Sequence, residues 1–384
     1  MSRQLSELRV QLQRKIRDKT DGTIELADQI DLFNRAIDKL KSFHEFPGTK
    51  QRAEFKVFEG VYEYAIPTGY KSVIDFRTPG DETDWDKRTS KEFWHDVNYT
   101  GNIHADDNYN ETKLLLINRK TAKGNTQLNS CDSLTANGTW AVDGTTDATN
   151  LTLDTSEYKE GSAALNFDVT GATTVAAVQN STMTALNLSG HEDKSSLFIW
   201  VYLPDVDNIT SVDLRWGSGT GNYWSVTATT QHSGIGFKVG WNQISFAWDG
   251  ATETGTPDSS AVNFVRCNIT YAAAQAADTD FRLDDIRSIM PERITLNYYS
   301  TNFVKDNDGT YETEFNDDDD VSILEEHEDV LLLYLALEEA FEILREPDDA
   351  AKARNKFMEL YEQITNDKPS EKEKPTDSYY YFPK

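Results

Sequence analysis

Few residues in this sequence have the types and spacing of a catalytic or metal site. Its histidines, at positions 44, 95, 104, 191, 232 and 327, show no HExxH or i, i+4 pair, and no paired-cysteine, GxGxxG or GxSxG motif is present. The GSGTG stretch at 217–221 lacks the lysine of a phosphate-binding loop, so it indicates a β-turn. We therefore expect no catalytic residue, no cofactor and no enzyme activity. An acidic-site hydrolase remains an alternative that rests on the abundance of carboxylates alone.

Two acidic stretches could hold a cation. The NDDDD sequence at 316–320 offers calcium ligands but lacks the glycine and glutamate of an EF-hand loop, which favours a solvated loop. His327 stands among Glu325, Glu326, Glu328 and Asp329, and we interpret it as a residue at the start of a helix.

Aromatic side chains are the remaining candidates for binding. Trp200 and Trp248 are flanked by alternating apolar residues, which favours the core. Trp216, Tyr223 and Trp224 surround the glycine-rich turn, where they are candidates for stacking on a glycan, with core packing as the alternative.

Another aromatic group lies at the end of the chain. Tyr379, Tyr380, Tyr381 and Phe382 follow a charged, proline-containing stretch that begins at Asp367. Aromatic rings beyond a flexible linker suggest an anchor for a partner, and folding back onto the chain's own domain is the alternative.

Composition limits the partners. The formal charge of −27 argues against nonspecific binding to DNA or to an anionic membrane, because both need a basic surface. The opening residues have no unbroken apolar stretch, so we expect folding in a cytoplasm and two free thiols at Cys131 and Cys267.

The elements that would position these residues follow from periodicity. Apolar residues at helical spacing predict two helices before Pro47 and two after Asp329. Strand-like residues on either side of the Pro67–Gly69 turn, KLLLIN at 113–118 and ERITLNYYS at 292–300 predict a small sheet. Between about 120 and 290, short alternating runs separated by turn residues predict a β-sandwich or jelly roll.

The predicted fold class is α+β and multidomain. Because each helix pair has an apolar stripe to bury, we expect a four-helix bundle built from both chain ends, with a small β-sheet. The expected domains are 1–119 with 291–366, an inserted jelly-roll sandwich at 120–290, and an extended tail at 367–384.

The outer segments resemble the head–tail adaptor, or connector, proteins of tailed bacteriophages. The stretches that match are LSELRVQLQRKIRDKTDGT, IDLFNRAIDKL, YEYAIPTGYKSVIDF, ERITLNYYS and LEEHEDVLLLYLALEEAFEI, in the family's order. The resemblance extends over roughly residues 1–118 and 291–384, a little over half of the chain, and each of these stretches alone is degenerate.

This resemblance implies a structural virion protein assembled in the host cytoplasm. Such proteins form a ring, commonly of twelve copies, below the portal protein and above the next tail or nozzle protein. DNA passes through the channel without sequence-specific binding, and no membrane is involved. The role of portal docking would fall on Tyr379 to Phe382.

The middle block looks like the jelly-roll modules related to carbohydrate-binding modules. YKEGSAALNFDV, LFIWVYLP, VGWNQISFAWDG and FRLDDIRSI carry the likeness. It implies a possible structural calcium near Asp132, Glu160 and Asp284. The alternative function is therefore a carbohydrate-binding surface or decoration protein.

Overall fold

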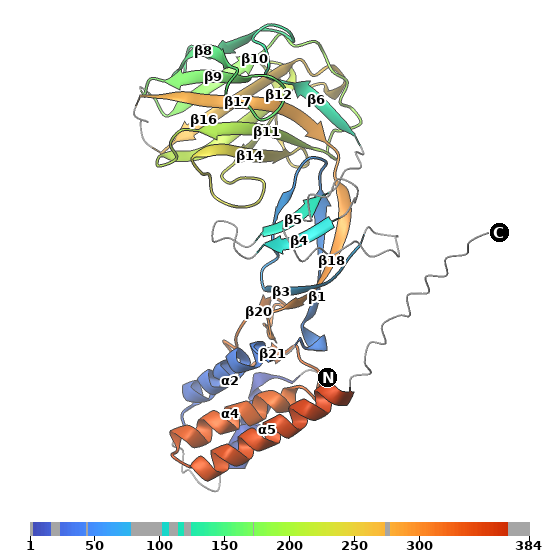
Figure 1. Ribbon diagram of the computed structural model, residues 1–384, viewed down its shortest axis with the longest axis vertical. Helices are drawn as coiled ribbons and strands as arrows, with labels where there is room; N and C mark the ends of the chain where they lie inside the picture. Colours follow the sequence, from blue (N-terminus) through green and yellow to red (C-terminus); the bar gives the residue numbers. More distant parts are fainter. Residues whose placement is uncertain are drawn as a thin grey trace, which may run out of the picture. The chain divides into compact units, whose positions relative to one another are not determined.

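The computed structural model describes residues 3–16, 24–43, 45–77, 102–106, 114–118, 124–171, 173–272 and 277–367, with backbone alone for 26–27, 102–106, 114–118 and 366–367. These residues fall into two compact units (Figure 1). The helical unit contains Met1–Ala53, Pro67–Phe76 and Leu296–Lys384, and the sandwich unit contains Glu54–Ile66 and Arg77–Thr295. This division differs from the predicted boundaries, because residues 54–66 and 77–118 group with the sandwich.

The helical unit takes its helices from both ends of the chain. They are α1 (Leu5–Ile16), α2 (Leu26–Lys41), α4 (Asp329–Ile343) and α5 (Pro347–Asp367). Apolar side chains from all of them form one hydrophobic core, in which α1 contributes Leu8, α2 contributes Phe33, α4 contributes Leu332 and α5 contributes Phe357. The apolar stripes that the sequence contains are therefore buried against one another.

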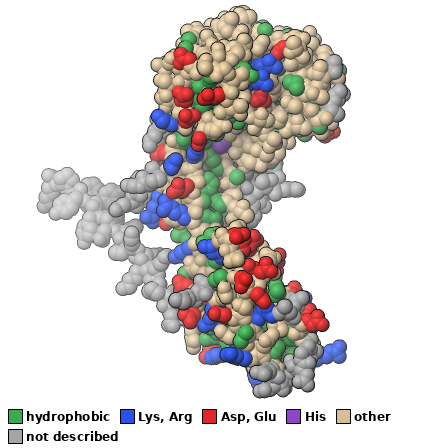
Figure 2. Space-filling model, turned by 180° about the vertical axis from the view of Figure 1, so that it is seen from behind, with side chains coloured by type: hydrophobic (Ala, Val, Ile, Leu, Met, Phe, Trp, Pro, Cys, Tyr) green, Lys and Arg blue, Asp and Glu red, His purple; other side chains and the backbone are tan. Residues whose placement is uncertain are grey.

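Short strands of the helical unit lie between the helix pairs in sequence. They pair in the order β20-β19-β21, with bounds β19 (Val304–Lys305), β20 (Tyr311–Glu312) and β21 (Val321–Ser322). Figure 2 shows acidic side chains gathered on one face of this unit, and Asp317, Asp318 and Asp319 are among its exposed residues. No helix among the described residues is both long and apolar enough to cross a bilayer.

Two further small three-stranded sheets are formed by strands outside the sandwich block. One has the order β1-β18-β3, and the unit boundaries fall within its strands: β1 (Lys50–Val57), β3 (Tyr70–Arg77) and β18 (Glu292–Ser300). The other belongs to the sandwich unit and has the order β2-β5-β4: β2 (Glu63–Ala65), β4 (Asn102–Asp106) and β5 (Leu114–Asn118). The strand predicted at KLLLIN is β5.

The block between residues 124 and 290 is a β-sandwich, as predicted. One sheet has the order β15-β13-β12-β16-β10-β7. Its strands are β7 (Trp140–Val142), β10 (Val175–Asn180), β12 (Ile209–Gly219), β13 (Asn222–Ala228), β15 (Thr252–Thr254) and β16 (Phe264–Tyr271).

The second sheet has the order β14-β11-β17-β9-β8, and β6 also pairs with β17. Its strands are β6 (Asn125–Asn129), β8 (Ala148–Asp154), β9 (Ala164–Val169), β11 (Ser196–Leu203), β14 (Gly240–Ala247) and β17 (Asp278–Ile289). The chain passes repeatedly from one sheet to the other, for example from β10 to β11 and from β11 to β12, which is the connectivity of a jelly roll (Figure 1).

The core of the sandwich lies between these sheets and consists of residues from Leu128 to Ile286. Cys131 and Cys267 are free thiols within it, both buried. The ends of the block are adjacent, because the Met290 amide donates to the Gly124 carbonyl at 2.8 Å. Adjacent ends are what an inserted domain requires.

Candidate functional site

The outer face of the sheet around β12 and β16 carries a row of polar side chains. Side chains alternate between the two faces of a strand, so Val212, Leu214 and Trp216 enter the core while Asp213 and Arg215 point outward. The outward side chains line a groove of about 620 Å³, whose further lining residues include Thr146, Thr173, Ser225, Thr227, Arg266, Asn268 and Thr270.

Hydrogen bonds and ion pairs join these groups across the strands. Asp213 accepts from Arg215 Nε at 2.9 Å and from Asn268 Nδ2 at 2.6 Å. Arg266 Nε donates to Asn268 Oδ1 at 2.6 Å, and its guanidinium pairs with Asp143 at 2.5 Å. The pKa of Asp143 lies below its ordinary range, chiefly because the Thr145 amide donates to it and with Arg266 as a further cause.

This network holds planar polar groups in fixed positions on a sheet. Each guanidinium has more donors than the network uses, and the hydroxyls of Ser225 and Thr270 both donate and accept. An open groove with mixed donors and acceptors suits a ligand with many hydroxyl groups. Asp213 and Asp143 are each paired with an arginine, so neither is arranged as a general acid.

The structure separates the three aromatic residues predicted to contact a glycan. Trp216 and Trp224 are 0% and 2% exposed, and both pack edge-on against Trp248 with ring centres 5.4 and 5.0 Å apart. Neither ring offers a face to a sugar, because strand alternation turns both inward despite the adjacent turn. Tyr223 is half-buried and lies beside the groove, where Arg215 is 5.2 Å from its ring centre.

The groove residues were not identified from the sequence. SVDLRW at 211–216 and FVRCNITY at 264–271 contain a polar residue at alternate positions, and these become Asp213, Arg215, Arg266 and Asn268. That alternation is a signal for one polar sheet face. It does not reveal that β12 and β16 are neighbours, which is what brings the four side chains together.

A second cluster lies at the loop between β8 and β9. Asp284 on β17 is fully buried, and its Oδ2 accepts the backbone amides of Lys159 at 2.7 Å and Glu160 at 2.9 Å. Its Oδ1 is buried and has no hydrogen-bond partner among the described residues. The pKa of Asp284 is raised to about 6, chiefly by burial and to a smaller extent by the carboxylates of Asp285 and Asp132, against the two amide hydrogen bonds, which lower it.

Asp132 faces the same loop. Its Oδ1 accepts the Ser162 amide at 2.5 Å and the Ala163 amide at 2.9 Å. Partial burial raises its pKa, but these backbone hydrogen bonds outweigh that effect and leave the pKa below its ordinary value. Glu160 takes part through its amide, since its carboxylate lies 3.9 Å from Arg287 Nη2.

The structure thus brings Asp132 and Asp284 to one loop, with the Glu160 side chain turned to Arg287. Asp284 Oδ1 is buried without a hydrogen-bond partner among the described residues, and the nearby carboxylate of Asp132 contributes to the raised pKa of Asp284. Such a pair of carboxylates would suit a hard cation such as calcium. The role of such an ion would be structural, because it would neutralise Asp284 and hold the loop.

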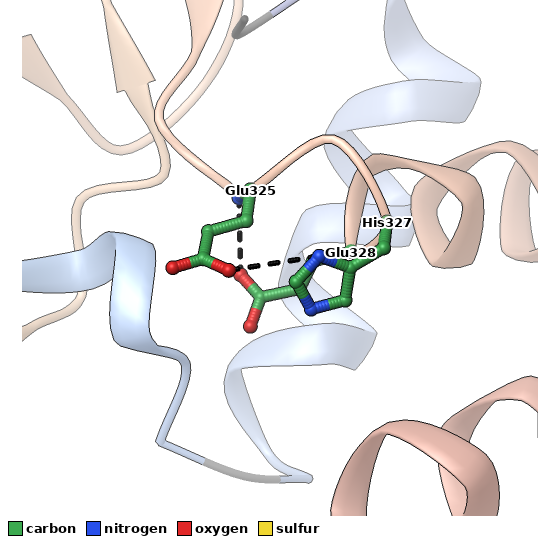
Figure 3. Close-up of side chains that lie close together, drawn as sticks. All are labelled: Glu325, His327 and Glu328. Atoms are coloured by element: carbon green, nitrogen blue, oxygen red, sulfur yellow. Dashed lines mark hydrogen bonds and ion pairs between the residues drawn. The ribbon is translucent and has the colours of Figure 1, made fainter. Parts of the chain in front are cut away.

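The acidic stretches of the helical unit have local explanations. Asp320 Oδ2 accepts the amides of Asn316 and Asp317 at 2.6 and 2.9 Å, which closes the NDDDD turn on itself. Figure 3 shows Glu325, His327 and Glu328 close together before α4. Glu328 Oε2 accepts the Glu325 amide at 3.1 Å, and His327 Nδ1 lies 3.6 Å from Glu325 Oε2. This is a hydrogen-bonded turn at the start of α4, and the exposed His327 pairs within it.

The tail residues Tyr379, Tyr380, Tyr381 and Phe382 lie outside the described residues. Their predicted docking role therefore stays a prediction.

Comparisons with known proteins give structural similarities alone. No protein-family model matches the chain, and no curated protein matches it. The chain is similar to a family 11 carbohydrate-binding module from Clostridium thermocellum in complex with a β-1,3-1,4-mixed-linked tetrasaccharide, with 14% identity, 44% of this chain and 98% of the module covered, and a TM-score of 0.32.

Two further solved structures have similar values. A family 30 carbohydrate-binding module has 13% identity, covers 44% of this chain and 88% of its own, and has a TM-score of 0.34. The C-terminal family 22 module of Clostridium thermocellum Xyn10B has 16% identity, coverages of 44% and 94%, and a TM-score of 0.24. The assignment of a β-sandwich rests on the strand order described above.

Proposed function

We propose that this chain is a non-enzymatic binding protein whose sandwich unit recognises carbohydrate in the groove over β12 and β16. The observation that supports this most is the continuous network from Asp143 through Arg266, Asn268 and Asp213 to Arg215. It orders donors and acceptors on a rigid sheet before any ligand arrives, which reduces the entropy lost on binding.

The groove would bind an oligosaccharide mainly through hydrogen bonds. Arg215 and Arg266 would donate to ring and hydroxyl oxygens, and Tyr223 at the edge would contact an apolar face of one sugar. A calcium ion at Asp132 and Asp284 would stabilise the sandwich without touching the ligand.

The test is a glycan array followed by calorimetric titration of each hit with the full-length protein. The array should contain the β-1,3-1,4-mixed-linked tetrasaccharide that the family 11 module binds. We expect Arg215→Ala to weaken binding about tenfold or more, since a charged hydrogen bond contributes roughly 1.5–3 kcal/mol.

The matched control is Lys194→Ala, which removes an exposed cation of the same sandwich outside the groove. Unchanged binding by Arg215→Ala, or an equal loss in the control, would contradict the assignment of the groove.

A second candidate function concerns the helical unit: a phage head–tail adaptor. It is favoured by the element order, in which helix pairs from both chain ends share one core and β18 returns beside β1 and β3. In this role the helices would form a four-helix bundle that packs side by side in a ring of about twelve copies around the DNA channel. The protein would then be part of the virion, between the portal protein and a tail or nozzle protein, while the sandwich carries the binding role.

This candidate is tested by mixing the protein with the portal ring of the same virus and imaging the mixture by negative stain. Full-length protein should decorate the ring, and a chain ending at Pro375, which lacks Tyr379 to Phe382, should not. Equal decoration by both chains would exclude the tail as the anchor, and no decoration by either would exclude the adaptor role.

A further inference from the structure

The second sheet of the sandwich has an aromatic stripe on its outer face. Leu197, Ile199 and Val201 of β11 face the core, so Phe198, Trp200 and Tyr202 face outward. Aromatic side chains on an outer sheet face do not contribute to the core between the sheets. The groups that contact these three rings on the outer face of the sheet therefore indicate their role.

Two of the three rings are covered by other aromatic or cationic groups of the sandwich unit. Phe198 packs against Phe58 and His232, with ring centres 4.8 and 5.1 Å away. Tyr202 lies against Trp241 at 5.5 Å and below the guanidinium of Arg282 at 4.6 Å. These rings serve the packing of neighbouring segments.

Trp200 lines a pocket, as Phe198 does, but a lysine and not an aromatic ring lies over its indole. The pocket has a volume of about 380 Å³ and lies between the outer face of β11, β14 and β17 and the turn that contains Glu59, Gly60 and Tyr62. Trp200 is half-buried, and Tyr62 is 43% exposed at the rim. The ammonium group of Lys159, at the end of a flexible side chain, is 5.0 Å from the Trp200 ring centre.

The polar side chains around the Trp200 ring are held in place by hydrogen bonds and ion pairs. Arg287 pairs with Asp285 and lies 3.9 Å from Glu160, and Asp285 also accepts from Gln127 at 2.6 Å. Asn125 donates to Glu59 at 3.1 Å. The carboxylates therefore have partners within the protein, and their remaining lone pairs, with the Gln243 amide across from Trp200, can still bond a ligand.

We infer that this pocket is a second saccharide-binding site, on the sheet opposite the groove, in which one pyranose ring stacks on Trp200. A pyranose has an apolar C–H face that suits an indole and hydroxyl groups at its edge that both donate and accept. The volume admits one sugar residue at the end of a chain or at a branch. Lys159 would swing off the ring and donate to a hydroxyl. The ligand class rests on the proposed function, whereas the location rests on the pocket alone.

The experiment uses full-length protein and the same array of soluble oligosaccharides, followed by calorimetric titration of each hit. We expect Trp200→Ala to lose about tenfold or more in affinity for at least one glycan whose binding Arg215→Ala leaves unchanged. The matched control is Trp241→Ala, an outward-facing tryptophan on β14 that does not line the pocket. It should bind as the unaltered protein does.

A rim variant guards against a folding defect in Trp200→Ala. Tyr62→Ala changes an exposed side chain at the pocket entrance and should weaken the same glycan without lowering the melting temperature. If both variants bind every glycan normally while Arg215→Ala fails, the pocket is not a saccharide site and the groove stands. If all variants bind alike, or the unaltered protein binds no glycan, both proposals are overturned.

Discussion

At the scale of single residues, Asp284 is the most unusual group in the sandwich unit. It is a fully buried carboxylate, one of whose oxygens accepts two backbone amides while the other has no hydrogen-bond partner among the described residues. A carboxylate in this position is stable either when it is protonated or when a cation neutralises it. We therefore expect it to make the stability of the sandwich depend on both pH and calcium.

The pH dependence follows from the raised pKa. Without a cation, the folded chain holds the Asp284 proton up to about pH 6, whereas the unfolded chain releases it near its ordinary value of 3.8. The free energy of unfolding should therefore fall as pH rises between these values, by about 2 kcal/mol from this group. In Asp284→Asn this contribution should vanish, as measured by urea unfolding in chelator at several pH values. An unchanged slope in the variant would contradict the assignment.

Calcium should act on the same residue. At about one hundred times its dissociation constant, a bound ion would stabilise the sandwich by about 2.7 kcal/mol, because it binds the folded state alone. Thermal unfolding followed by fluorescence of the buried tryptophans should show a higher melting temperature in calcium than in chelator. Asp284→Asn should abolish this difference, and a shift of the same size in the variant would place the ion elsewhere.

At the scale of elements, two loops hold the candidate sites in place. The loop between β8 and β9 reaches Asp132 through Gly161, which has a φ of +71°. A Cβ at this position would lie 2.4 Å from both carboxylate oxygens of Asp132. The glycine thus allows a positive φ and a close approach to the carboxylate at once.

Gly161→Ala should therefore destabilise the sandwich by about 1–3 kcal/mol and weaken calcium binding, because the loop must move away from Asp132. The control is Gly250→Ala, which has a φ of +83° but no neighbour within 4 Å of its added Cβ. The control carries the backbone strain alone, so calcium titration of the two variants separates strain from loss of the carboxylate contact. Equal calcium affinity in both variants would contradict the role of Gly161.

The turn at 58–64 packs against a half-buried histidine, His232. His232 packs against Phe58, Tyr64 and Phe198, and its Nδ1 lies 2.8 Å from the Ser245 hydroxyl. Burial lowers the pKa of His232 to about 4. The folded chain therefore binds this proton less readily than the unfolded chain, whose histidine titrates near 6.5.

Acid should consequently release this turn. Stability from His232 is complete above pH 6.5 and is lost as pH falls toward 4, with a limit of about 3 kcal/mol. The protection factors of residues 58–64 against hydrogen exchange, which correct for the slower intrinsic exchange in acid, should fall across that range in the unaltered protein. They should not fall in this way in His232→Phe, which keeps an aromatic ring in the cluster without a titrating group. An equal fall in the variant would assign the acid effect to another residue.

At the scale of the whole molecule, the sandwich has a core of its own. Its buried cluster consists of residues between Leu128 and Ile286, and the two ends of the block are joined by the hydrogen bond from Met290 to Gly124. The helical unit likewise buries its own cluster. Each unit therefore has the apolar core that independent folding requires.

A fragment of residues 124–290 should accordingly fold cooperatively and keep the groove over β12 and β16. It lacks Glu59, Gly60 and Tyr62, which form one wall of the Trp200 pocket. In the array it should retain the glycans that depend on Arg215 and lose those that depend on Trp200. Retention of both groups would show that the turn at 59–62 is not part of the second site.

Much of the architecture could be predicted from local pattern. Period-two alternation in segments such as SLFIWVYL and WNQISFAW predicted a β-sandwich, and apolar stripes predicted a helix pair at each end of the chain. These predictions succeed because burial of one face is a local property of a strand or helix. The resemblance to jelly-roll modules pointed to Asp132, Glu160 and Asp284 as calcium ligands; Asp284 and Asp132 both accept amides of the loop from 159 to 163, and their binding of calcium stays a prediction.

The identity of the site residues could be established only from the tertiary structure, because the sequence of a single strand does not specify which strands lie beside it. Trp216 and Trp224 are near a turn in sequence but face the core, whereas Trp200, expected in the core, lines a surface pocket. A shift of one residue exchanges the two faces of a strand, so composition alone could not distinguish these tryptophans. The sequence by itself determined the kinds of elements and their order, and the pairing of β12 with β16 and of β11 with β14 decided which side chains meet at a surface.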